Sequence, residues 1–94
     1  MSVYVIASLT IKDAVRFEDY RRTVLPTMEK YGGRLVAHGG PIVLEGAWPR
    51  ERLIIGEFPG MERAQQWWGS PEYAEPKALR LATADSELVI VQGV

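Results

Sequence analysis

Apolar residues along this chain change from one spacing to another, and each spacing predicts an element. Residues 3–11 are rich in β-branched and aromatic types and nearly continuously apolar, which is typical of a strand covered on both faces. Helical spacing follows, because apolar side chains recur on one face at Phe17, Tyr20, Val24, Met28 and Tyr31. Asp13 is suited to cap the start of this helix, and Gly32-Gly33 to end it. Pro26 within it predicts a kink or a split after Leu25.

The second half of the chain is made of shorter segments. Its apolar residues predict three further strands, at residues 34–38, 53–58 and 87–92. Residues 42–45 are a short apolar continuation of the first of these. A helix is expected from about residue 61 to residue 68. A second helix restarts at Ser70-Pro71, where serine suits the cap and proline the first helical position.

The predicted order is β-α-β-β-α-β with the second helix broken in two, which is the ferredoxin-like split βαβ arrangement. We therefore expect an α+β fold in which residues 1–94 form one domain and one antiparallel sheet carries the helices on a single face. The first, third and fourth strands are apolar on both sides, although helices cover only one side. In a chain this short, we expect the other face to pack on a second copy, which gives a homodimer.

Composition excludes several classes of function. Eleven Lys and Arg against twelve Asp and Glu leave a net charge of −1, so no basic field exists to bind nucleic acid. The absence of cysteine and the single histidine exclude disulfides, thiolate metal sites and multi-histidine metal sites. No apolar run approaches the ~18 residues of a membrane span, and the start lacks the positively charged region of a signal peptide. We expect a cytoplasmic protein with no metal and no membrane contact.

A series of short motifs runs through the whole chain: Phe17-x-x-Tyr20, Tyr31-Gly32-Gly33-Arg34, Leu44-Glu45-Gly46 followed by Trp48, Glu57-Phe58-Pro59, Trp67, Ser70-Pro71-Glu72-Tyr73 and Arg80. In this order and spacing they resemble the domain of unknown function 1330 family, within the dimeric αβ-barrel superfamily. The resemblance implies a ferredoxin-like protomer whose sheet packs on a second copy to close a barrel, with a cleft between helices and sheet. Related families on this scaffold include quinol-forming monooxygenases, muconolactone isomerases and heme-dependent peroxidases, whereas this family has no agreed reaction.

His38 is the candidate catalytic base, since histidine is the side chain that most readily exchanges a proton near neutral pH. On an alternating strand it points to the same side as Arg34 and Val36. Facing the helix-side cleft, it would serve as a general base or a ligand anchor; the alternative is a hydrogen-bonded histidine at the dimer seam. Arg34 would bind a ligand carboxylate, or pair with Glu45 or Glu57 across the sheet.

Arg80 and three aromatic residues are the remaining candidates for ligand binding. Arg80 would reach over the cleft toward an anion, or pair on the helix surface with Glu72 or Glu75. Large aromatic side chains are numerous for a chain of this size, and they would either line a pocket for a planar apolar ligand or pack in the core and the dimer. The aromatic candidates for ligand binding are Tyr20, Trp67 and Tyr73.

Three functions remain open at this point. The first is a small cofactor-free enzyme, of monooxygenase or isomerase type, that acts on a small organic molecule in the helix–sheet cleft. The second is a non-catalytic dimeric module that binds a small ligand there. In the third, the dimer acts only through a further partner.

Overall fold

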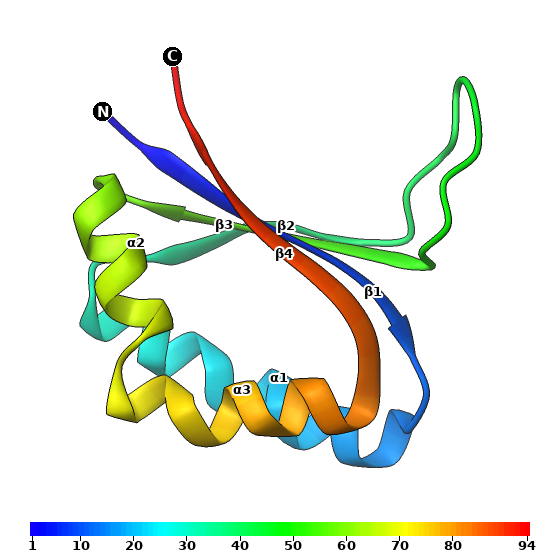
Figure 1. The fold of residues 1–94 in the computed structure, drawn as a ribbon, viewed down its shortest axis with the longest axis horizontal. Coiled ribbons are helices and arrows are strands. Elements are labelled where there is room, and N and C mark those ends of the chain that lie inside the picture. Colours follow the sequence, from blue (N-terminus) through cyan, green and yellow to red (C-terminus); the bar gives the residue numbers. More distant parts are fainter.

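Four strand-forming segments pair into a single antiparallel sheet, and three helices pack on one of its faces (Figure 1). The computed structural model describes residues 1–94. Along the chain the elements are β1 (Val3–Ile11), α1 (Ala14–Lys30), β2 (Arg34–Gly39), β3 (Arg52–Phe58), α2 (Met61–Trp68), α3 (Pro71–Thr83) and β4 (Ala84–Gln92). The strand order is β2-β3-β1-β4, and each neighbouring pair is antiparallel. This confirms the predicted α+β, ferredoxin-like fold.

Helix α1 begins and ends where its sequence predicts. The Asp13 carboxylate accepts a hydrogen bond of 3.1 Å from the backbone N–H of Arg16, which caps the first turn. At the other end, Gly32 adopts a φ of 82°, a conformation that favours glycine. The chain turns back there, and the N–H of Gly33 donates to the carbonyl of Met28 at 2.8 Å.

Pro26 lies inside α1 without dividing it. The proline lacks a backbone N–H and so removes one helical hydrogen bond, but the helix runs unbroken over Ala14–Lys30. Tyr20 before the proline and Met28 after it are both buried in the core, so tertiary packing holds the helix together across this position. Of the two expected effects of the proline, the split after Leu25 is therefore wrong.

The break between α2 and α3 follows the predicted cap. The hydroxyl of Ser70 accepts a hydrogen bond of 3.2 Å from the N–H of Tyr73, and Pro71 opens the helix. Strand β4 starts at Ala84, ahead of the predicted residue 87, because Ser86 and its neighbours continue the ladder along β1. Because this part of the strand contains polar residues, the spacing of apolar residues does not predict it. None of the three helices has the length and apolar character needed to cross a bilayer.

The sheet face that meets the helices carries the core. Alternate residues of β1 point toward the helices and are almost fully buried: Val3, Val5, Ala7 and Leu9. Together with side chains from β3, β4 and the three helices they form a cluster of 12 buried residues. Phe58 and Tyr73 are among its largest fully buried members.

The opposite sheet face, here called the outer face, carries a group of apolar side chains and is covered by no element of the chain. Ile6 of β1 and Ile55 of β3 pair across it, next to Leu53. At its edge on β4, Val89 and Val91 are 55% and 48% exposed. These residues alternate with the core residues of the same strands, so the predicted two-sided apolar pattern is present in the fold.

Residues 40–51 connect β2 to β3 as a long projecting loop, here called the β2–β3 arm. Figure 1 shows the arm extending well beyond the sheet on the side away from α2. Its apolar side chains are exposed: Ile42 is 88% and Leu44 92% accessible, so the predicted apolar continuation forms no strand. The arm is tied to the sheet by Arg50, whose guanidinium donates two hydrogen bonds, of 2.9 and 2.6 Å, to the Glu87 carboxylate.

Candidate functional site

A β-bulge in β2 decides which side chains face the helices. Leu35 pairs with Gly56 of β3, but the next pair is Ala37 with Ile55, so Val36 is an extra residue without a partner. The bulge reverses the alternation, and Leu35 and His38 both come to face the helices. The expectation that Arg34 and His38 share one side of the strand is therefore wrong, because that expectation assumes an unbroken alternation.

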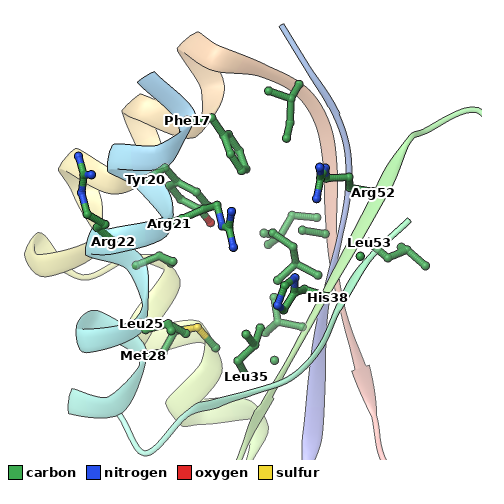
Figure 2. Close-up of a pocket in the computed structure, with 18 of the residues that line it drawn as sticks. Phe17, Tyr20, Arg21, Arg22, Leu25, Met28, Leu35, His38, Arg52 and Leu53 are labelled. Carbon is green, nitrogen blue, oxygen red and sulfur yellow. The ribbon is translucent and has the colours of Figure 1, made fainter. Parts of the chain in front are cut away.

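A cavity of about 400 Å³ lies between α1 and the sheet (Figure 2). Of its 21 lining residues 14 are hydrophobic, and they come from α1, from Trp67 of α2 and from all four strands. The space exists because α1 packs mainly on α3 and only lightly on β2, and because Gly56 and Ala7 place little or no side chain on the sheet beneath it. Its volume and apolar lining are typical of small-molecule sites.

Three polar side chains from opposite walls point into this cavity. Figure 2 shows Arg21 pointing from α1 toward the sheet, and His38 and Arg52 pointing from the sheet toward α1. All three residues are solvent-exposed, so they form the rim rather than the floor. The Arg21 guanidinium also donates a hydrogen bond of 3.0 Å to Glu18, which neutralises part of the charge. The rim therefore combines positive charge and an imidazole above an apolar interior.

A buried polar chain lies behind the cavity wall. Tyr20 lines the cavity, and its hydroxyl lies 3.2 Å from the hydroxyl of Tyr73. The Nε atom of Arg80 donates to the Tyr73 hydroxyl at 3.3 Å, and its Nη1 atom donates to the hydroxyl of Ser86. Burial raises the pKa of Tyr20 above its usual range, and the neighbouring Tyr73 adds to this effect, so the Tyr20 hydroxyl keeps its hydrogen at neutral pH.

Trp67 forms part of the apolar wall next to this chain. Its ring packs on the ring of Tyr73 with centroids 4.1 Å apart and on Phe58 with centroids 5.3 Å apart. Its indole N–H donates to the hydroxyl of Thr27 on α1 at 3.0 Å. These contacts hold the indole in one orientation against the cavity.

The predicted site residues divide into three groups. His38, Tyr20 and Trp67 line the cavity, whereas Tyr73 and Arg80 lie directly behind it. Arg80 is 4% exposed and pairs with neither of the glutamates considered for it.

Arg34 is separated from the cavity. It lies on the outer face, where its Nε donates to the Glu57 carboxylate at 2.7 Å, which is the cross-sheet pairing considered as an alternative. A hydrogen bond from Ser2 and the Arg34 guanidinium lower the pKa of Glu57 below its usual range. On α3, Glu72 binds Lys30 and the hydroxyl of Tyr31, which links α3 to the end of α1.

Sequence reasoning missed two arginines of the rim. Arg52 faces the cavity because it pairs with Leu9 and shares the alternation of Ile54 and Gly56, so extending the third strand backward by one residue predicts its direction. Arg21 follows Phe17 by four residues and therefore lies on the same face of α1. No group of three or more His, Cys, Asp or Glu side chains lies together as a metal site would require.

Solved structures of the same fold include proteins of known and unknown activity. A protein of unknown function from Rhodopseudomonas palustris, RPA0582, is 20% identical with a TM-score of 0.82, over 99% of this chain and 82% of that one. SnoaB, a cofactor-independent oxygenase from Streptomyces nogalater, is 14% identical with a TM-score of 0.73, over 99% and 93% of the two chains.

A third similar structure is a dimeric ferredoxin-like protein of unknown function from Jannaschia sp. CCS1, which is 8% identical with a TM-score of 0.79, over 99% and 100% of the chains. Comparison with curated proteins found no match. The family model for the domain of unknown function DUF1330 matches residues 2–94. With that match over almost its whole length, the chain belongs to the DUF1330 family.

Proposed function

We propose that the cavity between α1 and the sheet binds a small organic molecule and that the protein is a cofactor-free enzyme in which His38 removes a proton from this molecule. The observation that carries the proposal is the cavity itself: about 400 Å³ of mainly apolar space with the only imidazole of the chain at its rim. An apolar interior takes the hydrocarbon part of a ligand, while Arg21 and Arg52 meet polar groups at the mouth, where His38 also lies.

Proton removal is the first step of both reaction types under consideration. The imidazole takes a proton from a carbon next to a carbonyl group or on an activated ring, which leaves a carbanion or enolate. In an isomerase, the proton returns to a different carbon, and no oxidation takes place. In a monooxygenase, the carbanion donates electrons to O₂: a CH₂ group becomes a carbonyl, one oxygen atom enters the product and the other leaves as water. SnoaB, which is a cofactor-independent oxygenase on the same fold, supports the oxygenase version.

A second function is favoured by one specific observation about His38. The imidazole forms no side-chain hydrogen bond with another residue, so no protein group orients it as the base in a catalytic pair is normally oriented. An unanchored imidazole suits a ligand contact as well as a base. The alternative is therefore a non-catalytic module that binds the same kind of molecule.

We further propose that the protein is a homodimer through the outer face. The apolar side chains of this face, which include Ile6, Ile55 and the half-exposed Val89 and Val91, have no cover within the chain. Burying them against the same face of a second copy would remove that surface from water. Similar structures from Thermobifida fusca and Jannaschia sp. CCS1 are dimeric, which supports this proposal.

The experiment begins with a thermal-unfolding screen against three probes: 1,4-naphthohydroquinone, an α,β-unsaturated γ-lactone and decanoic acid. A true ligand at 100 times its Kd adds about 2.7 kcal/mol to stability, which is a readily measured rise in Tm. For the probe that binds, O₂ uptake reports oxygenation, and proton NMR in D₂O reports isomerisation. The His38→Gln variant should keep the rise in Tm and lose turnover by about 10²- to 10⁴-fold.

Arg34→Gln is the matched control, because Arg34 lies on the opposite sheet face and should affect neither binding nor turnover. If the wild-type protein binds a probe and does not turn it over, the enzyme proposal is wrong and the non-catalytic binding module is favoured. The absence of a Tm shift with all three probes would overturn both functions.

A further inference from the structure

Arg80 is a buried cation without a carboxylate partner. Its side chain is 4% exposed, and none of the ion pairs in the protein includes it. Its guanidinium donates to the neutral hydroxyls of Tyr73 and Ser86 and also lies within reach of the Tyr20 hydroxyl. A charge taken out of water is costly unless an opposite charge compensates it, so a buried guanidinium of this kind strongly favours negative charge nearby.

The direction of the hydrogen bonds leads from Arg80 to the cavity. The Arg80 Nε can only donate, so the Tyr73 oxygen accepts there. Tyr73 is fully buried, and the oxygen of Tyr20 is the one acceptor for its hydroxyl hydrogen. We infer that Tyr73 donates to Tyr20, because the reverse direction would leave the fully enclosed Tyr73 hydrogen without an acceptor, whereas the Tyr20 hydroxyl lies beside the cavity.

This order leaves the hydroxyl hydrogen of Tyr20 free. Tyr20 lines the cavity, and Figure 2 shows its side chain directed from α1 toward the space between helix and sheet. A hydroxyl that accepts a hydrogen bond becomes a better donor, and the positive charge of Arg80 at the far end of the chain strengthens the effect. The protein thus presents a polarised O–H group to an otherwise apolar chamber.

We propose that the Tyr20 hydroxyl is the donor that a bound ligand meets inside the cavity, that the ligand places an enolate or phenolate oxygen against it, and that Tyr73 and Arg80 are the positioning residues behind it. This inference rests on the proposed function, since it assumes that the cavity holds a ligand. It adds the ligand class: a molecule whose apolar body fills the chamber and whose oxygen carries negative charge when bound.

The Tyr20 hydroxyl would also stabilise the negative charge that forms when the ligand loses a proton. When a proton leaves the carbon next to a carbonyl group, the negative charge moves to the carbonyl oxygen. A preoriented donor at that position stabilises the enolate more than the ketone, which is the requirement for lowering the barrier. Tyr20 and His38 come from opposite walls of the cavity, so the inference requires a ligand that lies between them, with its carbonyl oxygen toward Tyr20 and the adjacent C–H group toward His38.

The test uses 4-nitrophenol and its methyl ether, 4-nitroanisole, as probes of matched shape. The wild-type protein should bind 4-nitrophenolate more tightly than the ether and lower the apparent pKa of bound nitrophenol, which visible absorption reports. Tyr20→Phe should weaken binding of the phenolate by about 10- to 100-fold and leave the ether unchanged. Tyr73→Phe, which breaks the chain behind Tyr20, should weaken phenolate binding by about 3- to 10-fold.

Tyr31→Phe is the control, because the Tyr31 hydroxyl donates to Glu72 at 2.8 Å and takes no part in the cavity. If Tyr20→Phe weakens the binding of both probes equally, Tyr20 has only a packing role and the inference is overturned. If wild type binds the phenolate and the ether equally well, the donor is absent although the cavity binds ligands, and the proposed function survives without it. If neither probe binds, the proposed function fails together with the inference.

Discussion

Gly33 and Gly56 both lie where an added Cβ atom would meet another side chain at 2.5 Å, but the two neighbours differ in their freedom to move. Beside Gly33 three atoms of the Phe58 ring lie within 2.9 Å of that position. Phe58 is fully buried and packs on Trp67, so its ring has no space to withdraw. Beside Gly56 the close atom is the terminal methyl group of Met28, with the cavity next to it.

We expect Gly33→Ala to destabilise the protein and Gly56→Ala to leave its stability nearly unchanged. Forcing a methyl group against a fixed ring destabilises the folded state by about 1–3 kcal/mol. Alanine also lowers the conformational entropy of the unfolded chain, which stabilises the folded state by about 0.4–1 kcal/mol. At the middle of both ranges, the net loss for Gly33→Ala is about 1.3 kcal/mol. The Met28 side chain has rotatable bonds, so its methyl group can move aside. The free energy of unfolding of Gly56→Ala should therefore stay within about 0.5 kcal/mol of wild type.

Equilibrium urea denaturation measures both differences, at several protein concentrations because association of the proposed dimer would add to stability. In Gly56→Ala the displaced Met28 methyl group should enter the cavity, so ligand binding should weaken while stability holds. Wild-type stability in Gly33→Ala, or an equal loss in both variants, would refute the reasoning that the mobility of the neighbour decides the cost.

Three further substitutions test other parts of the structure. Val89→Asp places a charge on the outer face and should convert the proposed dimer to monomer in sedimentation, whereas Val15→Asp, at an 83% exposed position on α1, should not. Gly32→Ala should lower the urea-derived stability by roughly 1–2 kcal/mol, because its φ of 82° strains any residue with a Cβ; a smaller loss would mean that the turn adapts. Hydrogen bonds from Lys30 and Tyr31 hold the pKa of Glu72 at about 2, below its ordinary 4.5. The stability that the ionised Glu72 adds to the folded state is therefore present above pH 4.5 and disappears as the pH falls toward 2. Glu72→Gln should therefore flatten the decline in stability over that range, and an unchanged pH profile would contradict this role.

The fold could be predicted from the sequence because its signals are local and repeated. Alternation in β1, helical spacing from Phe17 onward, the Asp13 and Ser70 caps and the paired glycines each predict one boundary, and together they leave one topology. Pro26 shows the limit of a local signal, since burial on both sides of it outweighs the lost hydrogen bond.

The candidate site was less predictable because it depends on pairings between distant segments. The direction of His38 follows from an extra residue in β2 that only the pairing with β3 reveals. Arg80 is buried because Tyr73 and Ser86, on either side of it in sequence, fold back on its guanidinium, and no periodic pattern predicts that a charged residue will point inward. The cavity itself comes from the way α1 leans on α3, which is a property of the assembled layers.

The bulge at Val36 has a consequence for how such proteins diverge. In a regular ladder of the same sequence, Val36 would pair with Ile55, so that Ala37 would face the cavity and His38 the outer face. Loss of the bulge at constant sequence length would thus move the imidazole out of the cavity, whereas deletion of Val36 would remove the bulge and keep His38 facing the helices. A relative with a histidine at the position aligned with His38 therefore need not present it on the same side of the sheet.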